Sequence, residues 1–202
     1  MRLSIDAAAR DLRAGLDLET IARRSKARAS FGGSMRKTLV SLLNFIGINQ
    51  LIRRPSTAGL WSKDEELVHF TSCLRYPVFV EGKNYSGQPD ILRSDLLRNQ
   101  LEMWLVEEMQ ALPDAIWIAL GDRAGVAARH AAGLSGLSED NLVIGLPHPS
   151  GANNERVAYL FGQKSRIELS VTTNDSTIDS ERERILAQVA RMVAKSETES
   201  AL

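Results

Sequence analysis

The sequence has little cysteine, no net charge and no long apolar run. Its 202 residues include one cysteine, Cys73, so an intramolecular disulfide is impossible and a metal site built from several cysteines is excluded. Lys and Arg number 25, as do Asp and Glu, which argues against binding nucleic acid through bulk positive charge. No run approaches the roughly 20 apolar residues that span a bilayer. Charges also interrupt the N-terminus too early for a signal peptide. These absences predict a cytoplasmic protein without a membrane partner.

The common catalytic motifs are also missing. The sequence has no Walker loop, no glycine-rich dinucleotide motif and no GxSxG nucleophile turn. The three histidines, His69, His130 and His148, lack the spacing of metal ligands, so we expect no metal and no cofactor. Asp122 follows an expected strand and is explained most simply as the N-cap of a helix.

Short apolar runs and helical stripes alternate along the chain. Hydrophobic residues make up 44% of it, which is enough for the core of one domain of the usual size. Apolar runs of strand length predict buried strands at residues 67–72, 115–120 and 142–146. Weak alternation predicts an edge strand at residues 167–172. Apolar stripes at helical spacing predict helices over residues 35–46, 94–112 and 180–195. We also expect a small-residue helix over residues 123–132 and a helix over residues 155–164.

This alternation predicts an α/β fold, a three-layer α/β/α arrangement with a short, mostly parallel sheet. We expect a helical N-terminal segment at residues 1–30, the α/β domain at residues 31–175, and a C-terminal helix with a frayed tail at residues 176–202. Ligands of such sheets bind beyond the carboxyl ends of the strands. We therefore expect the site where the chain leaves its strands, from Ser72, Gly121 and Pro147 onward.

The turn around His148 carries the most information. His148 lies between Pro147 and Pro149 just after an expected strand, and the two prolines restrict the backbone and so fix the direction of the imidazole. Residues 150–154 then offer N–H groups, a hydroxyl and two amides, which suit a phosphate or a polar base edge. On these residues alone, a rigid exit from the sheet is the slightly simpler explanation.

Residues 146–154 resemble the second active-site motif of the uracil-DNA glycosylase superfamily, a histidine–proline–serine turn that leads into a DNA-inserting loop. Residues 32–48, 67–77 and 96–124 resemble other blocks of that family in the same order, and the resemblance spans roughly residues 31–165. It implies an enzyme that flips uracil or a related damaged base out of DNA and hydrolyses the N-glycosidic bond of that base. The implied partner is DNA that contains a damaged base.

The resemblance also implies roles for individual residues. His148 would stabilise the departing base as its negative charge grows, and Ser150 would hold a phosphate beside the lesion. Tyr85 or Phe79 would stack on the flipped base, with packing in the core as an equally good explanation for Phe79. The remaining positions with an implied contact to substrate or DNA are Ser72, Gly151, Ala152, Asn153, Asn154 and Arg156.

Two departures from the family bear on activity. The family's first motif, a Gly- and Pro-bearing turn after the first strand, commonly supplies the residue that activates water. It has no match in residues 1–30, which contain Gly15 and no proline. Three explanations stay open: the start of the gene is truncated, helix replaces the first strand of the sheet, or the alignment is wrong here. Ser72 stands where many relatives place an asparagine that reads uracil. We therefore predict weak or absent uracil excision. Two alternatives stay open: a non-catalytic nucleic-acid or nucleotide-binding member of the fold, and an unrelated α/β domain whose turn serves packing or a protein partner.

Overall fold

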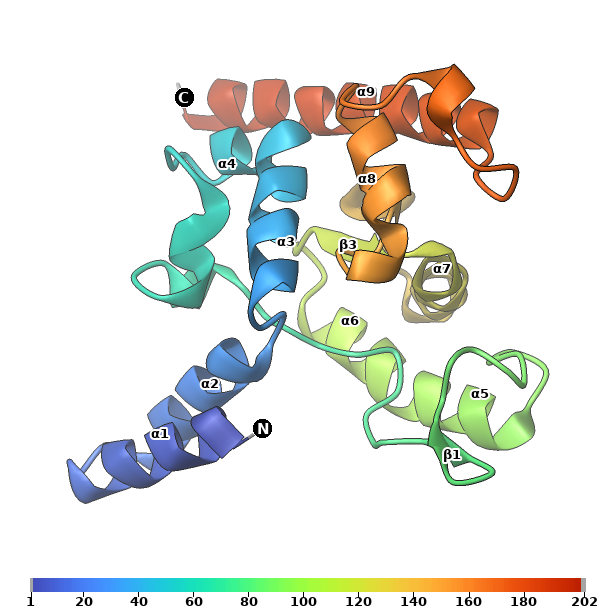
Figure 1. Cartoon of the computed structure of the whole chain (residues 1–202). Coiled ribbons are helices and arrows are strands. Elements are labelled where there is room, and N and C mark those ends of the chain that lie inside the picture. The colour runs from blue at the N-terminus through green and yellow to red at the C-terminus, as the bar shows by residue number, and fades with distance from the viewer. Residues whose placement is uncertain (1, 201–202) are drawn as a thin grey trace.

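The computed structural model describes residues 2–200, and most of them are helical (Figure 1). The last helix runs to Ser200 through most of the expected frayed tail, whose residues 201–202 lie outside the described part. The helices are, in chain order, α1 (Arg2–Arg13), α2 (Leu18–Ala29), α3 (Ser34–Phe45), α4 (Ile48–Leu51), α5 (Asp95–Leu101), α6 (Glu107–Ala111), α7 (Asp122–Ser135), α8 (Asn154–Leu160) and α9 (Asp175–Ser200). A π-helical turn, Glu102–Val106, joins α5 to α6.

The strands are few and short. The antiparallel pair is β1 (Phe79–Val80) with β2 (Lys83–Asn84), and the parallel pair is β3 (Trp117–Leu120) with β4 (Leu142–Leu146). The expected three-layer α/β/α fold is therefore wrong, because the described chain is mostly helical and holds two sheets of two strands each.

Side chains of helix α9 bond to backbone carbonyls of β4. The buried amide of Gln188 donates to the backbone carbonyl of Leu142 at 3.1 Å. The guanidinium of Arg184 donates to the carbonyl of Ile144 at 2.5 Å. These carbonyls lie on the edge of β4 where a third strand would pair. Side chains of α9 thus satisfy backbone groups that otherwise need a neighbouring strand.

Two of the expected strands do not form, because within residues 2–200 neither segment has a strand to pair with. Val68 and Phe70 pack against the core, but residues 68–72 join neither of the two sheets in the described chain. Residues 167–172 begin in a short 3₁₀ helix, Arg166–Glu168, whose capping box is formed by Ser165 and Glu168. An apolar run reports burial, whereas a strand also needs a pairing partner, which local sequence does not specify.

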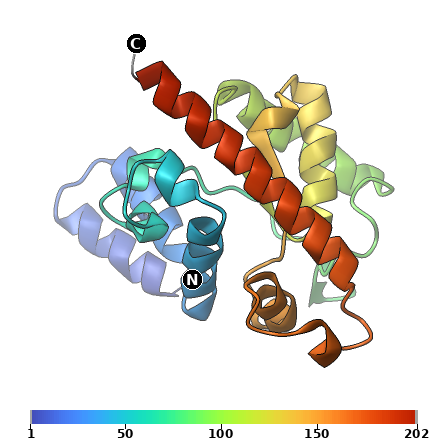
Figure 2. The same ribbon diagram turned by 90° about the horizontal axis from the view of Figure 1, so that it is seen from above.

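Two apolar clusters form the core. One gathers α3, α8, β4 and α9 around Leu42, Leu146 and Ile185, and the other gathers α5, α6, β3 and α7 around Leu101 and Met109. Seen from above, α9 crosses the whole molecule diagonally (Figure 2). This long helix packs on β4 and belongs to the first cluster, whereas β4 connects the two clusters, with Val143 and Leu146 in the first and Leu142 in the second.

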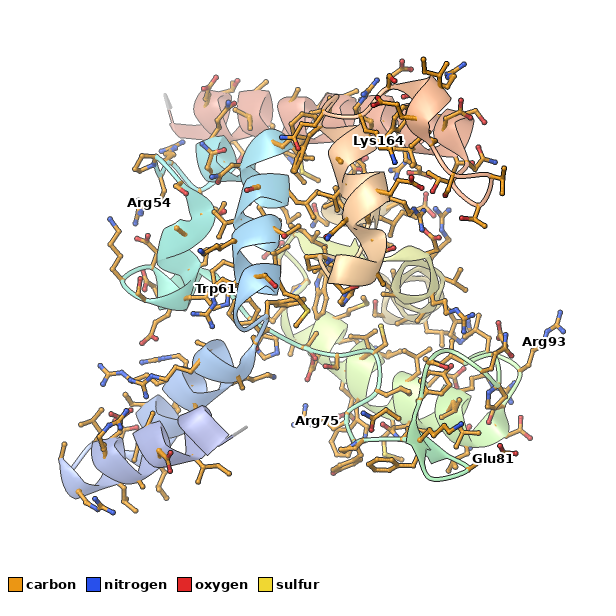
Figure 3. The ribbon with its side chains drawn as sticks, in the orientation of Figure 1. Arg54, Trp61, Arg75, Glu81, Arg93 and Lys164 are labelled. Atoms are coloured by element: carbon orange, nitrogen blue, oxygen red, sulfur yellow. The ribbon has the colours of Figure 1, made fainter. Side chains whose placement is uncertain are left out.

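Helices α1 and α2 form a hairpin that projects from the body (Figure 1). The joint lies at the end of α2, where the guanidinium of Arg36 donates to the carbonyls of Ala27 at 3.1 Å and Ser30 at 3.2 Å. The indole N–H of Trp61, marked in Figure 3, donates to the same Ser30 carbonyl at 3.1 Å. The Arg36 guanidinium also lies 5.4 Å from the centre of the Trp61 ring, so one cation–π pair anchors the hairpin.

Candidate functional site

A cavity of about 270 Å³, which we call cavity 1, lies between residues 72–91, a segment that includes the β1–β2 pair, and the first half of α7. Its wall is mostly apolar with a few polar groups, as is typical of sites for small ligands. The lining residues are Ser72, Cys73, Leu74, Tyr85, Gly87, Asp90, Ile91, Arg123, Ala124 and Val126.

Tyr85 is held rigidly in the wall of cavity 1. Its hydroxyl donates to the Pro89 carbonyl at 2.8 Å, and its backbone N–H donates to the Val78 carbonyl at 2.9 Å. Burial raises the pKa of the Tyr85 phenol, so the side chain stays neutral and keeps this bond at physiological pH. The ring is therefore a fixed aromatic surface.

Arg123 lies across Gly87, and the glycine is needed for this contact. A Cβ atom at Gly87 would lie 1.7 Å from Nη1 of Arg123, and the φ of Gly87 is +97°. Side chains other than that of glycine are strained at such a φ. Within residues 2–200, the Arg123 side chain has neither a hydrogen bond nor an ion pair. Its five N–H donors are thus available to a ligand.

Ser72 and Cys73 contribute different surfaces to the cavity. The Ser72 side chain is exposed and its hydroxyl has no partner among the described residues, so it can donate to or accept from a ligand. Burial raises the pKa of the Cys73 thiol, which keeps the sulfur protonated and unreactive. Cys73 therefore acts as apolar wall.

The His148 turn lies where the two parallel strands end. The Gly121 N–H after β3 donates to the Leu146 carbonyl of β4 at 2.8 Å. A Cβ atom at Gly121 would lie 3.3 Å from Cβ of His148, so the two strand exits nearly touch. Nδ1 of His148 accepts the Ser150 N–H at 3.3 Å, which leaves the proton of the neutral ring on Nε2. The imidazole centre lies 6.3 Å from that of Phe31.

The residues after His148 bind mainly to one another. The Asn153 amide donates to the Ser150 hydroxyl at 3.1 Å, and Gly151–Asn153 form a 3₁₀ turn that leads through Asn154 into α8.

Arg156 donates to both carboxylate oxygens of Asp122, at 3.0 and 3.2 Å. Asp122 is the first residue of α7, after Gly121 as N-cap. Asp122, which we expected to cap the helix, thus forms an ion pair instead. The same ion pair engages Arg156, which we expected to contact a phosphate.

The structure brings together only part of the predicted site. Ser72 and Tyr85 share cavity 1, whereas His148 and residues 150–154 and 156 do not line it. Phe79 lies in β1 and is 63% exposed, so it is not a core residue. Sequence reasoning missed Arg123 and Asp90. The available signal for Arg123 was its place one turn after an expected strand exit, where ligands of parallel strands bind.

The described chain lacks two further features. Across residues 2–200, no group of three or more His, Cys, Asp or Glu side chains is arranged to hold a metal ion. None of the helices in this range combines the length and apolar character that crossing a bilayer requires.

Comparison with known proteins supports one relationship. No protein-family model matches the chain, and no solved structure matches it. Over 181 residues the chain is 31% identical to the uncharacterized protein YoxB of Bacillus subtilis (strain 168), and the alignment covers 89% of this chain and 71% of YoxB. Identity of this extent over most of both proteins indicates common descent. The chain belongs to the same family as YoxB.

Proposed function

We propose that this protein binds uracil or a related damaged base that is flipped out of DNA, and that cavity 1 holds the base. The observation that carries the proposal is the meeting of Ser72, Tyr85 and Arg123 in one cavity. A base inside the double helix cannot be reached, so a protein that reads it must offer a pocket for the extruded ring. The proposal places the protein in the cytoplasm, with DNA as its partner.

The wall of cavity 1 offers a contact for each part of a flipped nucleotide. The fixed ring of Tyr85 can stack on the flat base, an interaction worth about 1–3 kcal/mol per base. The free hydroxyl of Ser72 can bond to a polar base edge. The free guanidinium of Arg123 suits the neighbouring phosphate, because its planar donors match phosphate oxygens. Asp90 already accepts the N–H groups of Leu92 and Arg93, at 2.9 and 3.2 Å, and so shapes the rim.

Hydrolysis of the glycosidic bond is the second candidate, and His148 favours it. An Nε2–H donor beside the leaving base would stabilise the electron pair that the base receives when its bond to the sugar breaks. His148 does not line cavity 1, however, and the sequence offers no match for the motif that activates water. We therefore expect binding with weak or absent cleavage by this chain.

Binding to mismatched DNA tests the proposal. One fluorescent duplex carries a U·G mismatch and a second carries U·A at the same place, because a mismatched base flips at lower cost. We expect the parent protein to bind the mismatched duplex more tightly than the U·A duplex. Tyr85→Ala and Arg123→Gln should each bind the mismatched duplex about tenfold more weakly than the parent protein does. Arg191→Gln is the control, since Arg191 is an exposed arginine of α9. Equal binding to both duplexes, or equal losses in all three variants, would refute the proposal.

Alkaline cleavage of the same duplexes separates binding from hydrolysis. We expect little strand cleavage, and no difference between the parent protein and His148→Ala. Strong cleavage that depends on His148 would show that the chain is a glycosylase and that our expectation of weak activity is wrong. A well-folded protein that neither binds nor cleaves would favour an interaction domain unrelated to DNA.

A further inference from the structure

A second cavity, of about 460 Å³, lies between α7 and α9. We call it cavity 2. Positions Asp122, Val126, Arg129 and His130 of α7 are spaced so that they share one face of the helix, and this face forms one wall. Thr177 and Glu181 of α9 belong to the opposite wall. The volume lies within the usual range for sites that bind small molecules.

The charged side chains of cavity 2 are paired, with one exception. Asp122 binds Arg156 through two hydrogen bonds, and Glu181 binds Arg184. Within the described part of the chain, Arg129 has neither a hydrogen bond nor an ion pair. The cavity therefore has an uncompensated positive charge.

A π-helical turn positions the remaining ionisable group. Nε2 of His130 lies 2.7 Å from a carboxylate oxygen of Glu102, the first residue of the π turn. Isolated π turns often occur at functional sites. The bond fixes the imidazole of His130 next to Arg129 in the wall and balances its charge when it is protonated. The positive charge of Arg129 is thus the only one in the described wall without a partner.

The rest of the wall is suited to an apolar ligand body. Leu92, Val126, Ile144 and Ile178 contribute aliphatic surface. Binding there would remove the apolar part of a ligand from water. The anionic group of the same ligand would reach the N–H donors of Arg129, which match carboxylate and phosphate oxygens. The Thr177 hydroxyl offers a further donor near the mouth of the cavity.

We propose that cavity 2 binds a small organic anion, a carboxylate or phosphate monoester on an apolar body, with Arg129 as its charge partner. This site is separate from the base-binding site in cavity 1. The two cavities share Val126 in their walls, but Ser72, Tyr85 and Arg123 line only cavity 1 and Arg129 lines only cavity 2. The proposal does not depend on DNA binding.

Isothermal titration calorimetry on the full chain tests this site with four compounds. Phenyl phosphate and phenylacetate supply both an anion and a ring, inorganic phosphate supplies the anion alone, and benzyl alcohol supplies the ring alone. We expect the first two to bind and the last two to bind at least about tenfold more weakly, because each lacks one of the two contacts. The stronger of the first two identifies the preferred anion. Absence of binding by both, or equal binding of all four, would overturn the proposal.

Three variants place the binding in cavity 2. Arg129→Gln should weaken binding of the preferred anion about tenfold, whereas Arg191→Gln should leave it unchanged. Thr177→Trp changes an exposed residue of α9 and should block cavity 2 without altering DNA binding at cavity 1. If the affinity survives both Arg129→Gln and Thr177→Trp in folded protein, the anion binds elsewhere and the proposal is wrong. If Arg191→Gln weakens binding as much as Arg129→Gln, the anion responds to overall charge only, which also refutes the site.

Discussion

Cavities 1 and 2 are neighbours on α7, but they are built differently. One side of cavity 1 is the segment of residues 72–91, which has little regular structure besides the short β1–β2 pair and is held in part by isolated hydrogen bonds, such as the one from the Tyr85 hydroxyl to the Pro89 carbonyl. Cavity 2 is walled mainly by helices α7 and α9 above strand β4, all of which take part in the apolar core. Both main walls of cavity 2 are therefore regular helices, whereas one wall of cavity 1 has little regular secondary structure and packs on the second core cluster through partly buried side chains such as Leu74 and Val78.

Because of this difference, we expect substitutions near the two cavities to affect ligand binding and the free energy of unfolding to different degrees. Segments with few buried contacts open at lower free energy than core elements do. Substitutions in residues 72–91 should therefore alter ligand binding more than the free energy of unfolding, and substitutions in the buried face of α9 should do the reverse. Three measurements test the contrast, beginning with the largest expected effect, and a fourth tests the loop before α9, which lies outside this contrast.

Ile185→Ala should cause the largest loss of stability. Ile185 is fully buried in α9 and belongs to the core cluster with Val143 and Leu146. Removing its methyl groups should lower the free energy of unfolding by about 3 kcal/mol, because it leaves a cavity. Urea denaturation measures this loss. Leu186→Ala, at a position 37% exposed on the same helix, should cost under about 1 kcal/mol. Similar costs for both variants would contradict the structure.

Gly87→Ala should affect cavity 1 in two ways. The positive φ at this position strains any side chain, which should cost about 1–2 kcal/mol, and the new Cβ atom should displace the Arg123 guanidinium. We expect weaker binding of mismatched DNA together with this modest loss of stability, measured by fluorescence anisotropy and urea denaturation. Gly133→Ala is the control, since that helical glycine has open space around it and no positive φ. Unchanged DNA binding in Gly87→Ala would show that Arg123 takes no part.

Tyr85→Phe removes one hydroxyl and leaves the ring. The lost bond to the Pro89 carbonyl should cost about 1 kcal/mol at most. We expect faster hydrogen exchange within residues 78–90 and unchanged exchange in α9, as measured by mass spectrometry. Equal acceleration in both regions would remove the contrast between local and global support.

The smallest expected effect concerns the loop before α9, whose structure should change only at acidic pH and not near neutral pH. Glu155 accepts bonds from Lys164 at 2.5 Å, Ser170 at 2.5 Å and Thr173 at 2.6 Å, and these hold its pKa at about 2, below the ordinary value of 4.5. The stabilisation is therefore complete above the ordinary pKa and is lost as pH falls through about 2. Amide signals of Ser170 and Thr173 should report this transition by NMR. Glu155→Gln should abolish it, and a midpoint near 4.5 in the parent protein would contradict the contacts.

Sequence predicted the helices better than the sheet, for a physical reason. The stripe of Leu39, Leu42 and Leu43 marks α3, since helical periodicity is a local property. The apolar runs of β3 and β4 also marked real strands. The run at residues 67–72 looks the same, yet it does not pair. Whether an extended run pairs depends on distant residues, such as Arg184 and Gln188 of α9, which satisfy the carbonyls of β4.

The candidate site was predictable only in part. The resemblance selected Ser72 and Tyr85, which the fold brings into one cavity, and also His148, which the fold leaves outside its wall. Arg123 was not selected, because only the folded chain shows that it lies over Gly87 and that it has no ionic partner among residues 2–200. The sequence shows which residues are charged, but only the tertiary structure shows which of them lack an ionic partner.

The bonds from α9 to β4 have a consequence for self-association. An open strand edge is a template on which another molecule can add a strand, which leads to domain swapping or aggregation. Gln188 and Arg184 occupy the carbonyls of Leu142 and Ile144 on this edge. The C-terminal helix thus occupies this edge of β4 and leaves fewer carbonyls there for a strand of a second molecule.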